Sequence, residues 1–138
     1  MLNRQIAATA LSAFLLCAAQ ALLVSPAIGQ SAADTVTKYD KDNDKTLDLN
    51  EVKAAAAAHF DKLNKDSDST LETKEVKGVI GPREFKAADT DHDGTISKDE
   101  YLALVEKLFK RADTNHDGTL SAAELKTKSG QALKRLID

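Results

Sequence analysis

Two stretches of the chain carry about one apolar residue per helical turn, residues 52–63 and residues 101–112. The apolar positions are Val52, Ala56, Phe60, Leu63, Tyr101, Leu104, Leu108 and Ala112. Residues three or four apart share one face of a helix, so this spacing predicts two amphipathic helices. A helix rises about 1.5 Å per residue, so each would hold its two ends about 18 Å apart.

The segment between the two predicted helices contains a helix break. A third apolar segment lies at the end of the chain. Gly81 and Pro82 adjoin in the middle of the interval, and Pro is poorly tolerated inside a helix. We therefore expect the chain to fold back at this point. The final segment, residues 125–138, is expected to form the last helix. Its apolar residues are Leu125, Leu133, Leu136 and Ile137.

Between these elements, polar residues form a fourfold repeat. The four segments align without gaps and read DKDNDKTLDLNE from Asp40, NKDSDSTLETKE from Asn64, DTDHDGTISKDE from Asp89 and DTNHDGTLSAAE from Asp113. We call residues 40–51, 64–75, 89–100 and 113–124 loops one to four. They hold 17 of the 22 acidic residues, and each ends on Glu. A repeat of this kind indicates four copies of one structural unit.

The repeat is similar to the calcium-binding loop of the EF-hand. A hard cation such as Ca²⁺ takes six to eight oxygen ligands, and this loop supplies them from positions 1, 3, 5, 7, 9 and 12. Position 7 contributes its backbone carbonyl, and the Glu at position 12 closes the site with both oxygens. The predicted metal ligands are Asp40, Asp42, Asp44, Thr46, Asp48, Glu51, Asn64, Asp66, Asp68, Thr70, Glu72, Glu75, Asp89, Asp91, Asp93, Thr95, Ser97, Glu100, Asp113, Asn115, Asp117, Thr119, Ser121 and Glu124.

The four loops are not expected to bind equally well. Position 6 of such a loop needs a positive φ, which Gly94 and Gly118 supply in loops three and four,. Lys45 stands there in loop one, and a non-glycine residue in this conformation costs about 1–2 kcal/mol. Loop two combines Ser69 at position 6 with the uncharged Asn64 at position 1. The sequence therefore predicts loop three as the strongest site and loop two as the weakest.

The aliphatic residue at position 8 of each loop is expected to pair with another loop in a short β-ribbon. These residues are Leu47, Leu71, Ile96 and Leu120. A helix between loops one and two would hold them at opposite ends, whereas the break at Gly81 and Pro82 would bring loops two and three together. We therefore predict pairing of loop two with three and of loop one with four. The predicted fold is all-α: a compact bundle of three or four short helices with four EF-hand loops joined by β-ribbons.

The first 29 residues have the composition of a secretory signal peptide. Arg4 is the only charge, residues 7–24 are apolar or small, and Ala27 to Gly29 form a small-x-small cleavage site before Gln30,. An uncleaved membrane anchor is the alternative. The only cysteine, Cys17, lies in this segment, so residues 30–138 form a cysteine-free metal-binding domain.

The net charge and the remaining polar residues argue against nucleic-acid binding, membrane binding and catalysis as the main function. A net charge of −3 is too small to indicate nucleic acid or a membrane surface as the partner. His92 and His116 occupy position 4 of loops three and four, from which side chains point outward, so neither is expected to be a ligand. No Ser-His-Asp set and no phosphate loop is present in the sequence. We therefore expect a protein that is not an enzyme.

The leader, the short shared helices and the ending from Gly130 to Ile137 resemble the lanmodulin family, periplasmic lanthanide-binding EF-hand proteins of methylotrophic bacteria. The resemblance covers essentially all of residues 30–138. It implies the same pairing of loops and a change from disorder to order on metal binding. Family members carry Pro at position 2 of the loops, where this chain has Lys41, Lys65, Thr90 and Thr114.

These features predict a periplasmic or secreted monomer that binds up to four Ca²⁺ ions as a buffer or as a metal-responsive sensor. Lanthanide binding, as in lanmodulin, is one alternative. A calcium-dependent protein-docking module similar to dockerin is another, although dockerins have two repeats and usually Asp at position 12. The metal ions are the expected partners, and a protein partner is left open.

Overall fold

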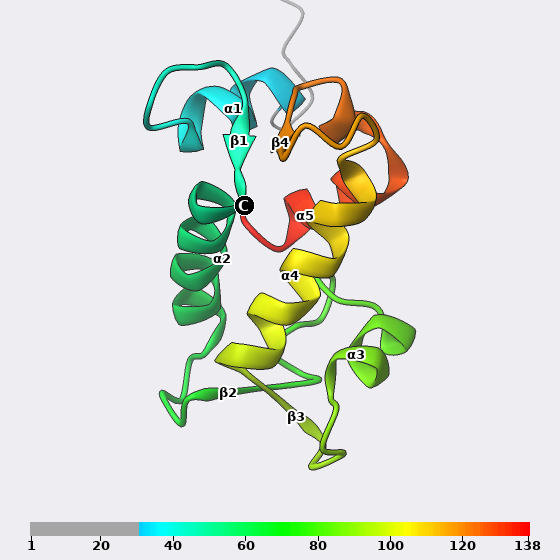
Figure 1. The fold of residues 1–138 in the computed structure, drawn as a ribbon. Coiled ribbons are helices and arrows are strands. Elements are labelled where there is room, and N and C mark those ends of the chain that lie inside the picture. Colours follow the sequence, from blue (N-terminus) through cyan, green and yellow to red (C-terminus); the bar gives the residue numbers. More distant parts are fainter. Residues whose placement is uncertain (1–30) are drawn as a thin grey trace, which may run out of the picture.

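The computed structural model describes residues 31–138. The predicted leader, residues 1–29, lies outside these residues, and so does Gln30 at the predicted domain start. Within residues 31–138 the chain is rich in helix and has two short antiparallel sheets (Figure 1). No helix in this part of the chain is both long enough and apolar enough to cross a membrane.

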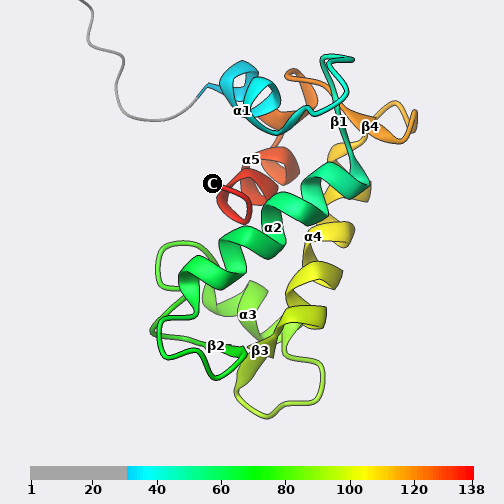
Figure 2. The same ribbon diagram turned by 90° about the vertical axis from the view of Figure 1, so that its left-hand side faces the viewer.

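Helices α2 (Leu49–Leu63) and α4 (Lys98–Ala112) form the centre of the fold and pack against each other (Figure 2). Both begin three residues before the predicted ranges, because the residue at position 9 of the preceding loop caps each helix. Asp48 accepts a hydrogen bond from the Glu51 amide, and Ser97 accepts one from the Glu100 amide. Such capping satisfies amide groups that have no partner within the helix.

The apolar faces predicted from the sequence form the core. All eight predicted positions are buried except Leu63, which is partly buried against the core. Between the helices, the rings of Phe60 and Tyr101 meet edge to face with centroids 5.5 Å apart. Aromatic pairs favour this arrangement because the edge of one ring is positive and the face of the other is negative.

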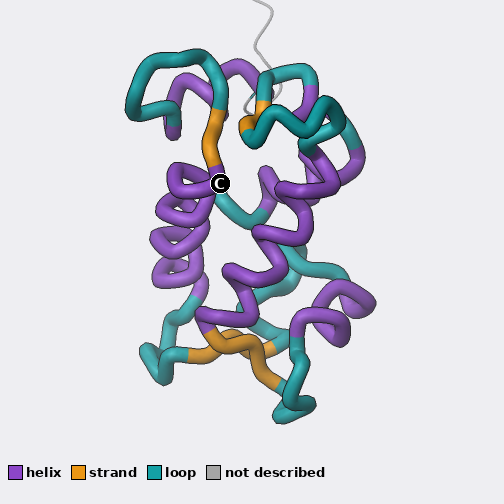
Figure 3. The backbone as a smooth tube through the Cα atoms, in the orientation of Figure 1, coloured by secondary structure: helices purple, strands orange, loops and turns teal. Residues whose placement is uncertain are grey.

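The loops pair as predicted. Strand β1 (Leu47–Asp48) pairs with β4 (Thr119–Leu120), and β2 (Thr70–Glu72) pairs with β3 (Thr95–Ser97), both antiparallel. The position-8 residues are direct partners: Leu47 faces Leu120, and Leu71 faces Ile96. The tube in Figure 3 shows the two ribbons at opposite ends of α2 and α4. Loops one and two are therefore held apart by α2, as the sequence predicts.

The predicted break at Gly81 and Pro82 is confirmed. Residues 73–80 form turns, in which the Val79 and Ile80 amides donate to the Val76 carbonyl. Helix α3 (Pro82–Ala88) then begins with Gly81 as its N-cap and Pro82 in its first turn. Pro fits this position because an amide there would have no partner in the helix.

The last helix, α5 (Lys128–Arg135), lies within residues 125–138 as expected, but the helices differ from the expectation in two respects. Residues 125–138 do not form one helix, because Thr127 is extended and separates the 3₁₀ turn η1 (Glu124–Lys126) from α5 (Lys128–Arg135). Helix α1 (Ala32–Tyr39) was not predicted, although it begins with a capping box between Ser31 and Asp34 that is a sequence signal for a helix start. The described residues thus contain five α-helices, not three or four.

The last three residues are fixed to the body of the fold. Tyr101 donates a hydrogen bond to the Leu136 carbonyl at 2.9 Å, and Tyr39 donates one to the Ile137 carbonyl. Asp138 accepts from Lys38 at 2.9 Å. These contacts place the chain end against α1 and α4.

Candidate metal centres

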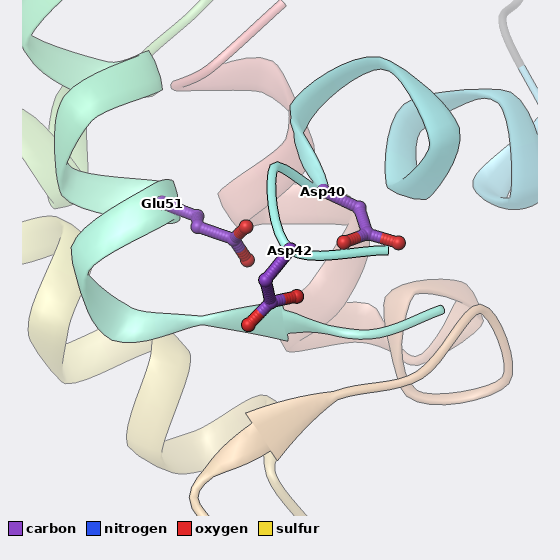
Figure 4. A group of neighbouring side chains, drawn as sticks. All are labelled: Asp40, Asp42 and Glu51. Atoms are coloured by element: carbon purple, nitrogen blue, oxygen red, sulfur yellow. The ribbon is translucent and has the colours of Figure 1, made fainter. Parts of the chain in front are cut away.

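Loop one brings three of its predicted ligands together. Asp40 and Asp42 come from the loop and Glu51 from the first turn of α2, and their carboxylates lie near one another (Figure 4). One oxygen from each residue lies within 4.8 Å of the others. Figure 4 shows the side chains gathered where the loop folds back over the start of the helix.

Loops two and three have comparable groups. In loop two they are Asp66, Glu72 and Glu75, and in loop three Asp89, Asp91 and Glu100. Loop four has Asn115 where loop three has Asp91, so it has one carboxylate fewer at the same positions. Acidic groups alone are common on protein surfaces. The hydrogen bonds within each loop distinguish these groups from ordinary surface carboxylates.

The Glu at position 12 is held in the same way in all four loops. One oxygen accepts from the position-2 amide and the other from the position-9 amide. The position-2 bonds are Lys41–Glu51 at 2.6 Å, Lys65–Glu75 at 2.9 Å, Thr90–Glu100 at 2.7 Å and Thr114–Glu124 at 3.1 Å. The position-9 bonds start at Asp48, Glu72, Ser97 and Ser121. Both ends of each loop are therefore tied to one carboxylate.

In loops two, three and four these hydrogen bonds favour the charged form of the carboxylate. Those from the Ser97 and Thr90 amides lower the pKa of Glu100 from its usual 4.5 to about 2. The Ser121 amide is the main cause of a lowered pKa at Glu124, and the Lys65 amide is the main cause at Glu75. Hydrogen bonds to the ionised form favour it. Glu75, Glu100 and Glu124 are thus prepared as anionic ligands.

The Asp at position 5 is oriented by the Thr at position 7, a role that the sequence analysis missed. The Thr amide and hydroxyl both donate to the same Asp oxygen in every loop. The hydroxyl bonds are Thr46–Asp44 at 2.6 Å, Thr70–Asp68 at 2.9 Å, Thr95–Asp93 at 2.8 Å and Thr119–Asp117 at 2.9 Å. All four repeats have Thr at position 7. Metal coordination needs only the backbone carbonyl of this residue, so the repeated Thr was a signal that its side chain has a further role.

The residue at position 6 has a positive φ in every loop, as predicted. The values are 71° at Lys45, 73° at Ser69, 86° at Gly94 and 85° at Gly118. In loops one, three and four the position-6 amide donates to the position-1 carboxylate, at 2.9 to 3.2 Å. In loop two, Asn64 instead accepts from the Ser67 amide at 2.9 Å. The two non-glycine residues therefore carry backbone strain.

The first ligand position of loops three and four has an unsatisfied oxygen. Asp89 and Asp113 are only 8% and 7% exposed. Oδ2 of each accepts from the position-6 glycine, while Oδ1 is buried without a hydrogen-bond partner. Buried polar atoms are nearly always paired, so each exception needs an explanation such as an ion. A cation bound among these oxygens would provide one, so the residues present fit a hard metal ion.

The position-4 residues and the third histidine have other roles. His92 and His116 are exposed at positive φ, and His92 Nδ1 lies 3.0 Å from the Asp89 carbonyl. They stay predicted non-ligands. His59 is buried with Nδ1 3.4 Å from the Tyr101 hydroxyl. Its surroundings in the helix interface are those of a packing residue.

Comparison with known families agrees with this geometry in the second half of the chain. The EF hand family model matches residues 83–105 and 104–127, which include loops three and four. These matches support an EF-hand protein and, with it, Ca²⁺ as the metal. A search of curated proteins found no match.

Proposed function

We propose that the chain binds Ca²⁺ in all four loops, through the ligands predicted from the sequence. The observation that carries this proposal is the pair of buried, unpaired oxygens at Asp89 and Asp113, the first ligand positions of the two segments that match the EF hand. Loops one and two repeat the same hydrogen bonds to the residue at position 12. The same function is therefore extended to them.

The chain's own residues hold the predicted ligands in place before an ion binds. Glu at position 12 is tied by hydrogen bonds to both ends of the loop, and Thr at position 7 fixes the carboxylate at position 5. Little side-chain freedom is then left to lose when an ion binds, and preorganisation of this kind raises affinity. A bound Ca²⁺ supplies the positive charge that offsets repulsion among the clustered carboxylates.

The ribbons join the loops into two units. Each ribbon links position 8 of two loops, so an ion that orders one loop also orders the strand paired with the other. Binding in the two loops of a pair is therefore coupled by the order that they share. The four sites act as two pairs, loops two and three and loops one and four.

The site of action follows from the leader. A cleavable leader at residues 1–29 would export the domain to the periplasm or beyond, where it acts as a monomeric Ca²⁺ buffer or sensor. Modules outside the cytoplasm work at dissociation constants of about 10⁻⁴–10⁻³ M. The strained position 6 of loops one and two is compatible with such affinities.

Lanthanide binding is the second candidate, and the five acids of loop one favour it. A trivalent ion of similar radius gains more than Ca²⁺ from each additional carboxylate. Loop one, with acids at five ligand positions, is therefore the site most suited to such an ion. The resemblance to lanmodulin supports the same candidate.

One competition experiment separates the two candidates. Tyr39 precedes Asp40 and Tyr101 follows Glu100, so each should sensitise Tb³⁺ emission from its neighbouring loop. We expect Tb³⁺ to bind the metal-free protein and Ca²⁺ at millimolar concentration to displace it. Emission that resists millimolar Ca²⁺ would favour lanthanide capture, and the absence of sensitised emission would contradict ion binding at loops one and three.

A further inference from the structure

Loop two contains a positive charge among its own predicted ligands. Lys74 Nζ lies 2.5 Å from Glu72 Oε2 and 3.7 Å from Asp66 Oδ2. Asp66 and Glu72 are the predicted ligands at positions 3 and 9, and both belong to the loop-two acidic group. Lys74 is thus in contact with two of the carboxylates that an ion in this loop would need.

The contact with Glu72 is electrostatic. Glu72 Oε2 is shielded from water, and the Lys74 ammonium 2.5 Å away is the positive group that contacts it. Lys74 therefore neutralises a carboxylate that an ion in loop two would use.

The other loops have no equivalent lysine. Position 11 is Asn50 in loop one, Asp99 in loop three and Ala123 in loop four. The lysine nearest to this position, Lys98 of loop three, is directed away from the loop and pairs with Asp61 at 2.8 Å. Lys74 differs from these residues because a helix begins at the end of loops one and three, whereas turns form at the end of loop two. Asn50 and Asp99 lie in the first turns of α2 and α4, whereas Lys74 lies in the turns of residues 73–80.

We propose that Lys74 is a built-in competitor for the cation and lowers the affinity of loop two, so that this loop fills last. The proposal rests on the proposed function, since it concerns ion binding in the same loops. An entering ion must separate Lys74 from Glu72 and Asp66 before their oxygens are free to bind it. Loop two is weak for this reason in addition to its uncharged Asn64 and strained Ser69.

The expected size of the effect is modest. The Lys74 side chain is 69% exposed, and exposed ion pairs contribute little because water and salt screen them. An effect of about twofold to fivefold on the dissociation constant is in the range of such pairs. It should shrink as the ionic strength rises, because screening shortens the reach of exposed charges.

The test compares three variants of the metal-free protein by NMR during a Ca²⁺ titration. Amide resonances of Ser69 and Leu71 report loop two, and those of Gly94 and Ile96 report loop three. Lys74→Gln removes the competing charge at similar length. Lys74→Arg keeps it, and Lys98→Gln removes the same charge from a lysine that pairs outside the loops.

We expect Lys74→Gln to lower the dissociation constant of loop two about twofold to fivefold at low salt, with a smaller change at 0.5 M salt. In Lys98→Gln and Lys74→Arg the dissociation constant of loop two should stay close to that of the original chain. Equal loop-two affinity in the original chain and Lys74→Gln would overturn the proposal while leaving ion binding intact. A gain of the same size in Lys98→Gln would also overturn it, since net charge would then be the cause. Resonances that do not move in any loop would instead refute the proposed function.

Discussion

The Tyr101 hydroxyl donates a hydrogen bond to the Leu136 carbonyl at 2.9 Å, in a fully buried position. Tyr101 directly follows Glu100, the last predicted ligand of loop three. The chain end is therefore fixed to the helix that begins in a metal loop. Burial also raises the pKa of Tyr101, so its hydroxyl stays a donor throughout the range in which proteins are usually studied.

Replacing Tyr101 with Phe should destabilise the fold by about 1–3 kcal/mol, the usual cost of leaving a buried polar group without its partner. Urea unfolding of the Ca²⁺-loaded protein measures this free energy. Tyr39→Phe is the comparison, because Tyr39 makes the equivalent bond to Ile137 in a partly buried position. The unfolding free energy lost in Tyr39→Phe should be smaller than that lost in Tyr101→Phe. If Tyr101→Phe unfolds like the original chain, the bond to Leu136 contributes nothing to stability.

Gly130 in α5 should not tolerate a side chain. A Cβ there would lie 2.2 Å from the Glu124 carbonyl oxygen and 2.5 Å from Leu125 Cα. Both atoms belong to the backbone of η1 and cannot move aside without displacing the turn that ends loop four. Gly130→Ala should therefore cost at least the 1–3 kcal/mol typical of overpacking. Thermal unfolding checks this, and a stability equal to that of the original chain would show that α5 packs elsewhere.

Gly94 should be needed for its conformation rather than for space. Its φ is 86°, and a Cβ there would meet nothing within 4 Å. Gly94→Ala is expected to cost about 1–2 kcal/mol, the penalty of a left-handed conformation, and to weaken Ca²⁺ binding in loop three. Gly81→Ala is the matched control, since Gly81 has a φ of −76° and room for a methyl group. Equal effects of the two substitutions would contradict a special role for φ.

Glu106 should titrate well below an ordinary glutamate. The hydrogen bonds that it accepts from Lys110 and Lys53 lower its pKa from the usual 4.5 to about 2. The folded pKa lies below the unfolded one. The stabilisation by these pairs is therefore complete above pH about 4.5 and is lost as the pH falls towards 2. Carboxyl ¹³C shifts followed against pH measure the midpoint. We expect it to rise towards 4.5 in the double variant Lys53→Met, Lys110→Met; a midpoint near 4.5 in the original chain would contradict the pairing.

The arrangement of the loops could be predicted because it depends on local features of the sequence. A helix of fixed rise separates loops one and two, and Gly81 with Pro82 marks a strong break between loops two and three. Position 8 is aliphatic in each repeat, which identifies Leu71 and Ile96 as partners. These signals need no knowledge of distant contacts.

The missed features depend on contacts that a repeat does not specify. Helix α1 is short and gains its stability from packing, with Val36 and Thr35 buried against the rest of the chain. The direction of Lys74 depends on the turns at residues 73–80, which replace the helix found after loops one and three. The break at Thr127 follows from its role as N-cap of α5, where it accepts from the Gly130 amide.

The most direct test of four ion sites is a Ca²⁺ titration of the metal-free protein, followed through the position-6 amides. These amides belong to Lys45, Ser69, Gly94 and Gly118, and three of them donate to the position-1 carboxylate of their own loop. If four ions bind, all four resonances should shift and then saturate. The Gly94 resonance should saturate first and the Ser69 resonance last. Resonances that stay in place at saturating Ca²⁺ would show that the loops are acidic turns that bind no ion.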